Sequence, residues 1–214
     1  SGGDGDDTYI INSTTFYLWD SGGNDTAIVN VDFAKIPSFI KDENITYADG
    51  VQALPYWISA LIYDKTASYS SSQIASENTY YFGFPTSESD YFHVLRSKDT
   101  NGWLGFSQEQ KDGTRLIFNY IETVINLNFI ETSNFDQANT IAFANNQQET
   151  STGYAFPPLW GWGTGNHDVY IDILSSGGFR VPQDGSWYAD IFVHEIGHAI
   201  GLKHPFSSPG STGS

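Results

Sequence analysis

The segment from His194 to His204 constrains the fold more than any other part of the chain, because its histidines can meet only on a defined backbone. It reads HEIGHAIGLKH and fits the pattern H-E-x-x-H-x-x-G-x-x-H. His194 and His198 are four residues apart, so a helix would place both imidazoles on one face. Gly201 can adopt the left-handed conformation that ends a helix, and the chain can then turn back to present His204. The pattern predicts a helix that ends near Gly201 and a cluster of three imidazoles.

Three imidazoles at this spacing are typical of a catalytic zinc site. Three protein ligands leave a fourth tetrahedral position open for water, whereas a structural zinc site is closed by four protein ligands. Glu195 follows the first histidine directly and can act on that water as a general base without binding the metal. The competing interpretation is an ordinary amphipathic helix with surface or core histidines. It does not explain why three of the five histidines fall within eleven residues.

The residues from His194 to Pro205, HEIGHAIGLKHP, resemble the zinc-binding helix of the serralysin family of secreted bacterial metzincins. Upstream, residues 152–157 (TGYAFP) followed by 168–171 (DVYI) resemble the strand pair that precedes this helix in the family. The resemblance implies that the edge strand formed by Gly153, Tyr154, Ala155 and Phe156 binds an extended peptide substrate by β-strand addition. The alternative is that this segment is a sheet edge and nothing more.

One feature departs from the serralysin pattern. Members of that family carry a methionine turn beneath the metal, closely followed by a tyrosine, but this chain contains no methionine and only ten residues follow His204. We therefore expect the C-terminal part of the catalytic domain to be missing, so that this part would itself be a partner of the chain. The chain is expected to be a fragment of a longer protein.

The first ten residues suggest a second kind of metal site. Residues 2–10 (GGDGDDTYI) fit the calcium-binding β-roll nonapeptide G-G-x-G-x-D-x-U-x once, and residues 22–29 (GGNDTAIV) repeat it imperfectly. Asp4, Asp7 and Asp25 are the candidate calcium ligands, because Ca²⁺ prefers carboxylate and carbonyl oxygens. The repeats resemble the repeats-in-toxin modules that accompany serralysins, although there they follow the protease domain. A Gly/Asp-rich linker is the alternative.

Composition limits the partners. The net charge is −16, with nine Lys and Arg against 25 Asp and Glu, so a nucleic acid is not an expected partner. No apolar run has the roughly 20 residues that a membrane-spanning helix needs. The chain has no cysteine, which excludes disulfides and cysteine metal sites. The expected partner is a protein or peptide substrate, and the resemblance implies secretion by a bacterium.

The remaining pattern predicts an α+β fold in which helices pack against a mixed sheet, and the resemblance implies that this is a metzincin-like twisted sheet with a long zinc-binding helix. Strands are predicted at 26–33, 80–84, 128–132, 140–144 and 169–174, and a short helix after Pro55. Ser107 and Gln110 form a capping box that opens a helix, in which Leu116, Ile117, Tyr120, Ile121 and Val124 are expected to face the sheet. Ser186 is the expected N-cap of the zinc helix.

The predicted elements and motifs divide the chain into three segments. Residues 1–50 are predicted to form a Gly/Asp-rich, β-roll-like calcium-binding segment, in which 41–50 is a polar connector. Residues 51–205 would form the metzincin-like catalytic domain, and 206–214 a flexible tail. The expected reaction is peptide-bond hydrolysis by a zinc-activated water, with Glu195 as general base. The alternative is a non-catalytic or inactive protease-like module of a large calcium-dependent secreted adhesin.

Overall fold

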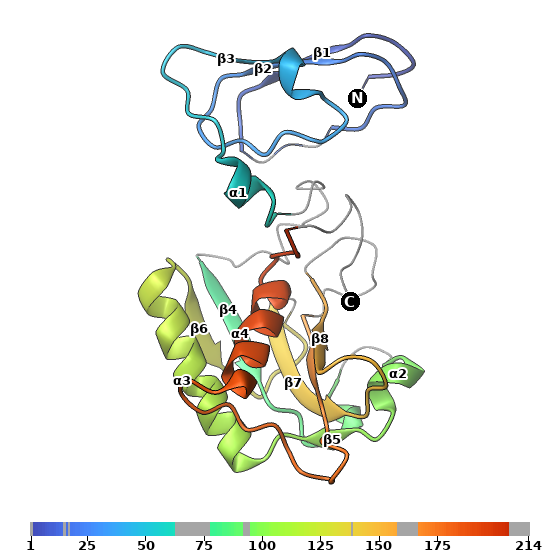
Figure 1. The fold of residues 1–214 in the computed structure, drawn as a ribbon, viewed down its shortest axis with the longest axis vertical. Coiled ribbons are helices and arrows are strands. Elements are labelled where there is room, and N and C mark those ends of the chain that lie inside the picture. Colours follow the sequence, from blue (N-terminus) through green and yellow to red (C-terminus); the bar gives the residue numbers. More distant parts are fainter. Residues whose placement is uncertain are drawn as a thin grey trace. The chain divides into compact units, whose positions relative to one another are not determined.

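The computed structural model describes residues 2–14, 16, 18–62, 78–91, 95–137, 139–157 and 167–205. The chain divides into two compact units, an N-terminal unit over residues 1–69 that also includes 202–213, and a C-terminal unit over residues 70–201. Both strands and helices are present, and the larger sheet is mostly parallel (Figure 1). The predicted combination of helices with a mixed sheet is confirmed at this level. None of the described helices has the length and apolar character to cross a bilayer.

The N-terminal unit is a stack of parallel strands in which each strand pairs with the chain 18 residues further on. Strands β1 (Thr8–Ile11), β2 (Thr26–Val29) and β3 (Ile45–Tyr47) form a parallel sheet, with Thr8 paired to Thr26 and Ala27 to Ile45. Alternate side chains are buried between the coils: Tyr9, Ile11, Ala27, Val29, Ala34 and Ile40 form the core of this unit. The unit is therefore a coil with an 18-residue period.

Two predictions for this region are corrected by the structure. The strand predicted at 26–33 is present as β2 but ends four residues earlier, at Val29, and Phe33 lies in the turn that follows, with a positive φ of 57°. The polar connector predicted at 41–50 contains a 3₁₀ turn η1 (Asp42–Asn44) and the strand β3. Its apolar residues are few, so only the pairing with β2 shows that it belongs to the stack. The short helix after Pro55 is confirmed as α1 (Tyr56–Ser59), with Pro55 as its N-cap residue.

The C-terminal unit contains a six-stranded sheet. Five of its strands follow the order β6-β4-β7-β9-β8, and the sixth, β5, pairs with β7. The strands are β4 (Thr79–Gly83), β5 (Leu104–Gly105), β6 (Asn128–Glu131), β7 (Thr140–Asn146), β8 (Gly153–Ala155) and β9 (Val169–Asp172). Strands β4, β6, β7 and β9 are parallel, and β5 and β8 are antiparallel to their neighbours. Four predicted strands are thus confirmed, with ends shifted by up to two residues.

Helices α3 (Gln108–Val124) and α4 (Trp187–Ala199) pack on one face of this sheet (Figure 1). A 3₁₀ turn η3 (Glu88–Asp90) and helix α2 (Ser97–Thr100) lie in the connection between β4 and β5. The shared core is rich in aromatic side chains, and Phe118 lies 4.4 Å from both Phe82 and Phe129 between ring centroids. Such pairs add to the free energy of burial. This core fixes the position of α4 against β9 and β8.

The capping box of α3 is confirmed, since Ser107 Oγ accepts from Gln110 N at 3.2 Å and Gln110 Oε1 accepts from Ser107 N at 3.0 Å. Of the five residues of α3 predicted to face the sheet, two are buried and three are not. Ile117 and Ile121 are buried, but Leu116, Tyr120 and Val124 are 60–69% exposed. The helix instead buries Gln110, Gly113, Thr114 and Phe118, and the missing side chain at Gly113 allows it to approach Pro182 closely.

Candidate metal centre

Helix α4 carries the histidine motif, and both of its ends are set by the sequence features predicted for them. Ser186 is the N-cap, and its Oγ accepts from Ala189 N at 3.2 Å. The helix ends at Ala199, and Gly201 follows with a φ of +108°, which only glycine adopts readily. The buried side of the helix, with Phe192, Ile196 and Ala199, packs into the core of the C-terminal unit.

The structure brings the three predicted histidines together. The Nε2 atoms of His194 and His198 lie 3.1 Å apart, and one nitrogen each from His194, His198 and His204 lies within 4.8 Å of the others. With Zn–N bonds of about 2.0–2.1 Å, two ligands of a tetrahedral zinc lie about 3.3–3.4 Å apart. The observed spacing of His194 and His198 is close to this value. The donor set, three imidazoles and no thiolate, also suits zinc with one open position.

Glu195 is buried, with 6% of its surface exposed, and burial raises the pKa of its carboxyl group to about 7. It lies on α4 between the two histidines of the motif and against β8. A Cβ atom built on Gly153 would stand 3.0 Å from Glu195 Cγ and 3.1 Å from Oε1. The absence of a side chain at Gly153 therefore leaves the space that the Glu195 side chain fills. A carboxyl group with a pKa near neutrality can both accept and donate a proton.

The segment predicted to bind substrate forms the edge strand β8 and the two residues beside it. Tyr154 pairs with Tyr170 of β9, and Ala155 with Val169, so the predicted strand pair is present. In the part of the chain that the structure describes, no other strand pairs with the opposite side of β8. Phe156 continues the ladder through its N–H, which donates to Asp168 O at 3.0 Å.

The other two histidines differ in what the structure shows. His167 is fully buried, and its Nδ1 lies 2.8 Å from the carbonyl oxygen of Ala199, the last residue of α4. His167 is therefore a hydrogen-bonded residue that ties the end of α4 to the chain that leads into β9. His93 lies outside the described residues.

The aspartates of the N-terminal unit form a different group from the one predicted. Carboxylate oxygens of Asp7, Asp20 and Asp25 lie within 4.8 Å of one another. Asp4 is not in this group; it is exposed and accepts a hydrogen bond from Ser21 Oγ at 2.6 Å. Asp20 was missed by the sequence reasoning. It accepts from Tyr9 Oη at 2.6 Å, and this hydrogen bond raises the pKa of Tyr9 to about 12.

The 18-residue register explains both results. Residues 7–12 (DTYIIN) and 25–30 (DTAIVN) are near copies 18 positions apart, which places Asp7 beside Asp25, and this repeat could have been found in the sequence. Asp20 is 18 residues after Gly2, so no periodic signal marks it. A Cβ atom on Gly2 would collide with both Asp7 Oδ2 and Asp20 Oδ1. The oxygen cluster thus exists because the paired position is glycine.

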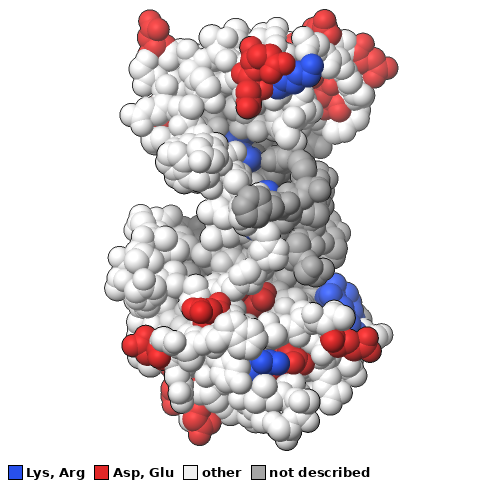
Figure 2. All heavy atoms as spheres, viewed as in Figure 1, with Lys and Arg blue, Asp and Glu red and all other residues white. Residues whose placement is uncertain are grey.

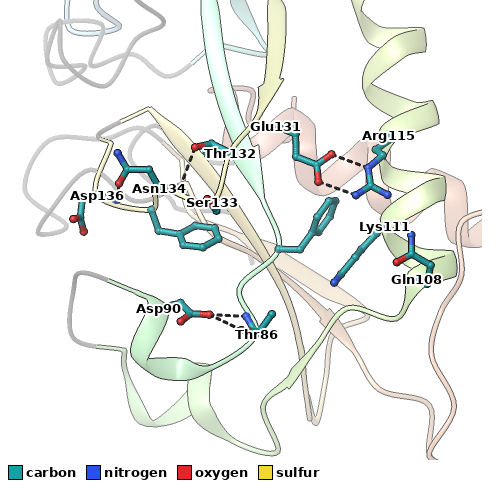
Figure 3. A pocket seen from close by; sticks show the side chains of 12 residues that line it. Thr86, Asp90, Gln108, Lys111, Arg115, Glu131, Thr132, Ser133, Asn134 and Asp136 are labelled. Carbon is teal, nitrogen blue, oxygen red and sulfur yellow. Dashed lines mark hydrogen bonds and ion pairs between the residues drawn. The ribbon is translucent and has the colours of Figure 1, made fainter.

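A pocket of about 840 Å³ lies elsewhere in the C-terminal unit, between α3, η3 and the ends of β4 and β6 (Figure 3). Two of the charged side chains that line it bind each other: the Arg115 guanidinium donates two hydrogen bonds of 2.7 Å to the Glu131 carboxylate. None of the motif histidines, Glu195 or the β8 residues lines it. The pocket is therefore separate from the histidine cluster.

Acidic side chains are spread over the visible surface and do not form one patch (Figure 2). A comparison with models of known protein families found none that matches this chain.

Proposed function

We propose that this chain is a zinc-dependent endopeptidase of serralysin-like, metzincin type. The observation that carries the proposal is the position of His194, Glu195 and His198 on α4 directly against the edge strand β8. This arrangement joins a zinc-type donor pair, a buried carboxyl group and a strand able to pair with a peptide. The resemblance of residues 194–205 to the serralysin motif supports the same conclusion.

The residues that would hold zinc are His194, His198 and His204, each in its neutral form. Zinc held there would act as a Lewis acid on the scissile carbonyl and lower the pKa of a water to about 7. Glu195 would accept a proton from the attacking water and return it to the leaving amine. Burial of Glu195 keeps bulk water from solvating its carboxylate.

The peptide would be bound by the backbone of β8. Asp172 N donates to Thr152 O and Phe156 N donates to Asp168 O, so residues 152, 154 and 156 direct their backbone groups toward β9. Because an antiparallel ladder alternates, Gly153 and Ala155 direct theirs to the other side. An extended substrate that pairs there would run past Glu195, which lies against Gly153.

The test measures zinc content and casein cleavage on the same preparation, with Glu195→Gln and His198→Ala as variants. We expect stoichiometric zinc in the wild type and in Glu195→Gln, loss of zinc in His198→Ala, and cleavage only in the wild type. Glu195→Gln preserves the size of the side chain and removes the proton acceptor, so it separates the metal site from catalysis. Zinc without cleavage would favour the alternative, a non-catalytic protease-like module of a calcium-dependent adhesin.

Calcium is a second proposed ligand, at Asp7, Asp20 and Asp25. Three carboxylates with oxygens within 4.8 Å of one another repel each other unless a cation lies among them or protons are taken up. The glycine at position 2 keeps this space open. The role of calcium would be to stabilise the N-terminal stack, and we expect no direct part in hydrolysis.

A further inference from the structure

Two basic side chains lie over the aromatic side chains of the proposed substrate strand. Lys98 Nζ is 4.4 Å from the centre of the Tyr154 ring, and Arg96 Cζ is 4.0 Å from the centre of the Phe156 ring. Lys98 Nζ is also 6.0 Å from the Phe156 ring. These distances are typical of cation–π contacts. With only nine Lys and Arg in the chain, two at one strand edge are a marked local excess of positive charge.

The Tyr154 ring lies between the Lys98 ammonium group and the Tyr170 ring. Tyr170 of β9 is paired with Tyr154, and its ring stacks on one face of the Tyr154 ring with centroids 5.1 Å apart and an interplanar angle of 27°. Because Tyr170 covers this face, the opposite face of the Tyr154 ring is left for the Lys98 ammonium group.

The two cations differ in how far they are neutralised. Arg96 donates to the buried carboxylate of Asp99 through Nε and Nη2 at 3.0 and 2.9 Å. Tyr154 Oη also donates to Asp99, at 2.8 Å. Burial would raise the pKa of Asp99, but these hydrogen bonds outweigh it and lower the pKa. Asp99 therefore holds Arg96 and Tyr154 in place as an ionised acceptor.

Lys98, by contrast, makes no ion pair with any residue in the described ranges. Burial, followed by repulsion from Arg96, lowers the pKa of its ammonium group, and the weaker attraction of Asp99 opposes this shift. A partly desolvated cation gains more from an incoming carboxylate than a fully hydrated one does. Lys98 is thus the group over Tyr154 that an acidic ligand would neutralise.

A substrate strand that pairs with β8 would bring side chains to this place. Residues directly opposite in a ladder point to the same face of the sheet, with Cβ atoms about 4.5–5.5 Å apart. Gly153 and Ala155 face α4, as their contacts with Glu195 and the core show. The substrate residue opposite Tyr154 would therefore point away from α4, toward Lys98. This substrate residue would be the direct neighbour of the one that pairs opposite Gly153, and Gly153 lies against Glu195.

We propose that Lys98 determines specificity, by favouring peptides with Asp or Glu at the residue that pairs opposite Tyr154, within about two positions of the cleaved bond. The inference rests on the proposed function in one respect, that a peptide pairs with β8. Arg96 and Asp99 act as positioning residues that hold the Tyr154 and Phe156 rings beneath the ammonium group.

The test uses a peptide that the zinc-loaded protein cleaves, with Glu, Gln or Lys placed in turn at each position near the cleaved bond. At one position we expect Glu to exceed Gln by about five- to tenfold in kcat/KM, the effect of one partly exposed charge pair. Lys98→Gln should remove this preference and leave cleavage of the Gln peptide within about twofold. Lys111→Gln makes the same change of net charge on α3 and should retain the preference.

Binding of the same peptides to the Glu195→Gln protein, measured by fluorescence anisotropy, gives a readout without turnover. A Glu preference that is lost in Lys98→Gln but kept in Lys111→Gln supports the inference in either assay, even if no casein or peptide is cleaved and the endopeptidase proposal fails. Equal kcat/KM and equal affinity for Glu and Gln peptides at every position would overturn it. So would a Glu preference that survives Lys98→Gln.

Discussion

Gly153 of β8 lies directly against Glu195 of α4, so that a single added carbon at position 153 would stand 3.0–3.3 Å from three atoms of the Glu195 side chain. Contacts of this length are tighter than ordinary van der Waals contact between carbon atoms. The strand that would bind the peptide and the residue that would move the proton are therefore in direct contact.

We expect Gly153→Ala to lower casein cleavage severalfold and Gly153→Val to lower it by about 100-fold or more, because each displaces the Glu195 carboxyl group from its position. Zinc content should remain that of the wild type, since the atoms nearest to an added carbon at Gly153 all belong to Glu195 and none to a histidine of the motif. The control is Ser151→Ala, two residues earlier. Wild-type cleavage by Gly153→Val would contradict the role given to this contact.

The pKa of Glu195 predicts how the stability of the metal-free protein depends on pH. Its carboxyl group has a pKa of about 7 in the folded protein and 4.5 when unperturbed, so the folded state holds the proton more tightly. This stabilisation is fully present below pH 4.5, declines as pH rises and is lost above about pH 7. Relative to Glu195→Gln, the free energy of unfolding should fall by about 2–3 kcal/mol between about pH 5 and pH 8.

The measurement is urea unfolding of both proteins in the presence of a chelator, at a series of pH values. The amide introduced by Glu195→Gln is neutral at every pH, so the difference between the two proteins isolates the carboxyl group. A difference that does not vary with pH would show that Glu195 is not held in a protonated form by burial.

Calcium binding predicts a thermal shift that depends on Asp20. We expect millimolar calcium to raise the unfolding temperature of the N-terminal unit by several degrees, because a ligand of the folded state stabilises it by mass action. Asp20→Asn should reduce this shift strongly, while Asp4→Asn should leave it unchanged, since only Asp20 lies in the oxygen cluster. Equal shifts in the two variants would place calcium elsewhere or show that its effect is not specific.

Gly113 offers a test of packing against helix propensity. Replacing glycine with alanine inside a helix usually stabilises a protein by about 1 kcal/mol. At Gly113 a Cβ atom would lie 2.5 Å from Pro182 O and 2.7 Å from Pro182 Cγ, so backbone would have to move. We expect Gly113→Ala to destabilise by about 1–3 kcal/mol in chemical unfolding, whereas Asn119→Ala, at an exposed position of the same helix, should not. A stabilised Gly113→Ala would show that α3 can move away from Pro182.

The features that local sequence determines were predicted well. Ser107, Gln110 and Ser186 act through hydrogen bonds within three residues, and the spacing of His194 and His198 is a property of any helix. The exposed faces of α3 were not predicted, because Leu116 and Tyr120 satisfy the same apolar period as Ile117 and Ile121. Which arc is buried depends on what the helix meets, here Pro182 and the sheet.

The parts of the sites that depend on distant pairing were missed for the same reason. Asp20 joins Asp7 and Asp25 only through the stacking of coils, and no local pattern marks it. Lys98 reaches Tyr154 across 56 positions of sequence, from a short helix to an edge strand. In both cases the residue types are ordinary, and only their juxtaposition gives them a chemical role.

The 18-residue register of the N-terminal strands has a consequence for how such a unit can change in evolution. Each coil contacts only the coils next to it, and the contact is made by residues at equivalent positions. Adding or deleting one block of 18 residues would leave every remaining interface intact, whereas a change of one residue would turn a whole strand inside out. Length in whole blocks is therefore the variable that selection can alter most freely in this part of the molecule.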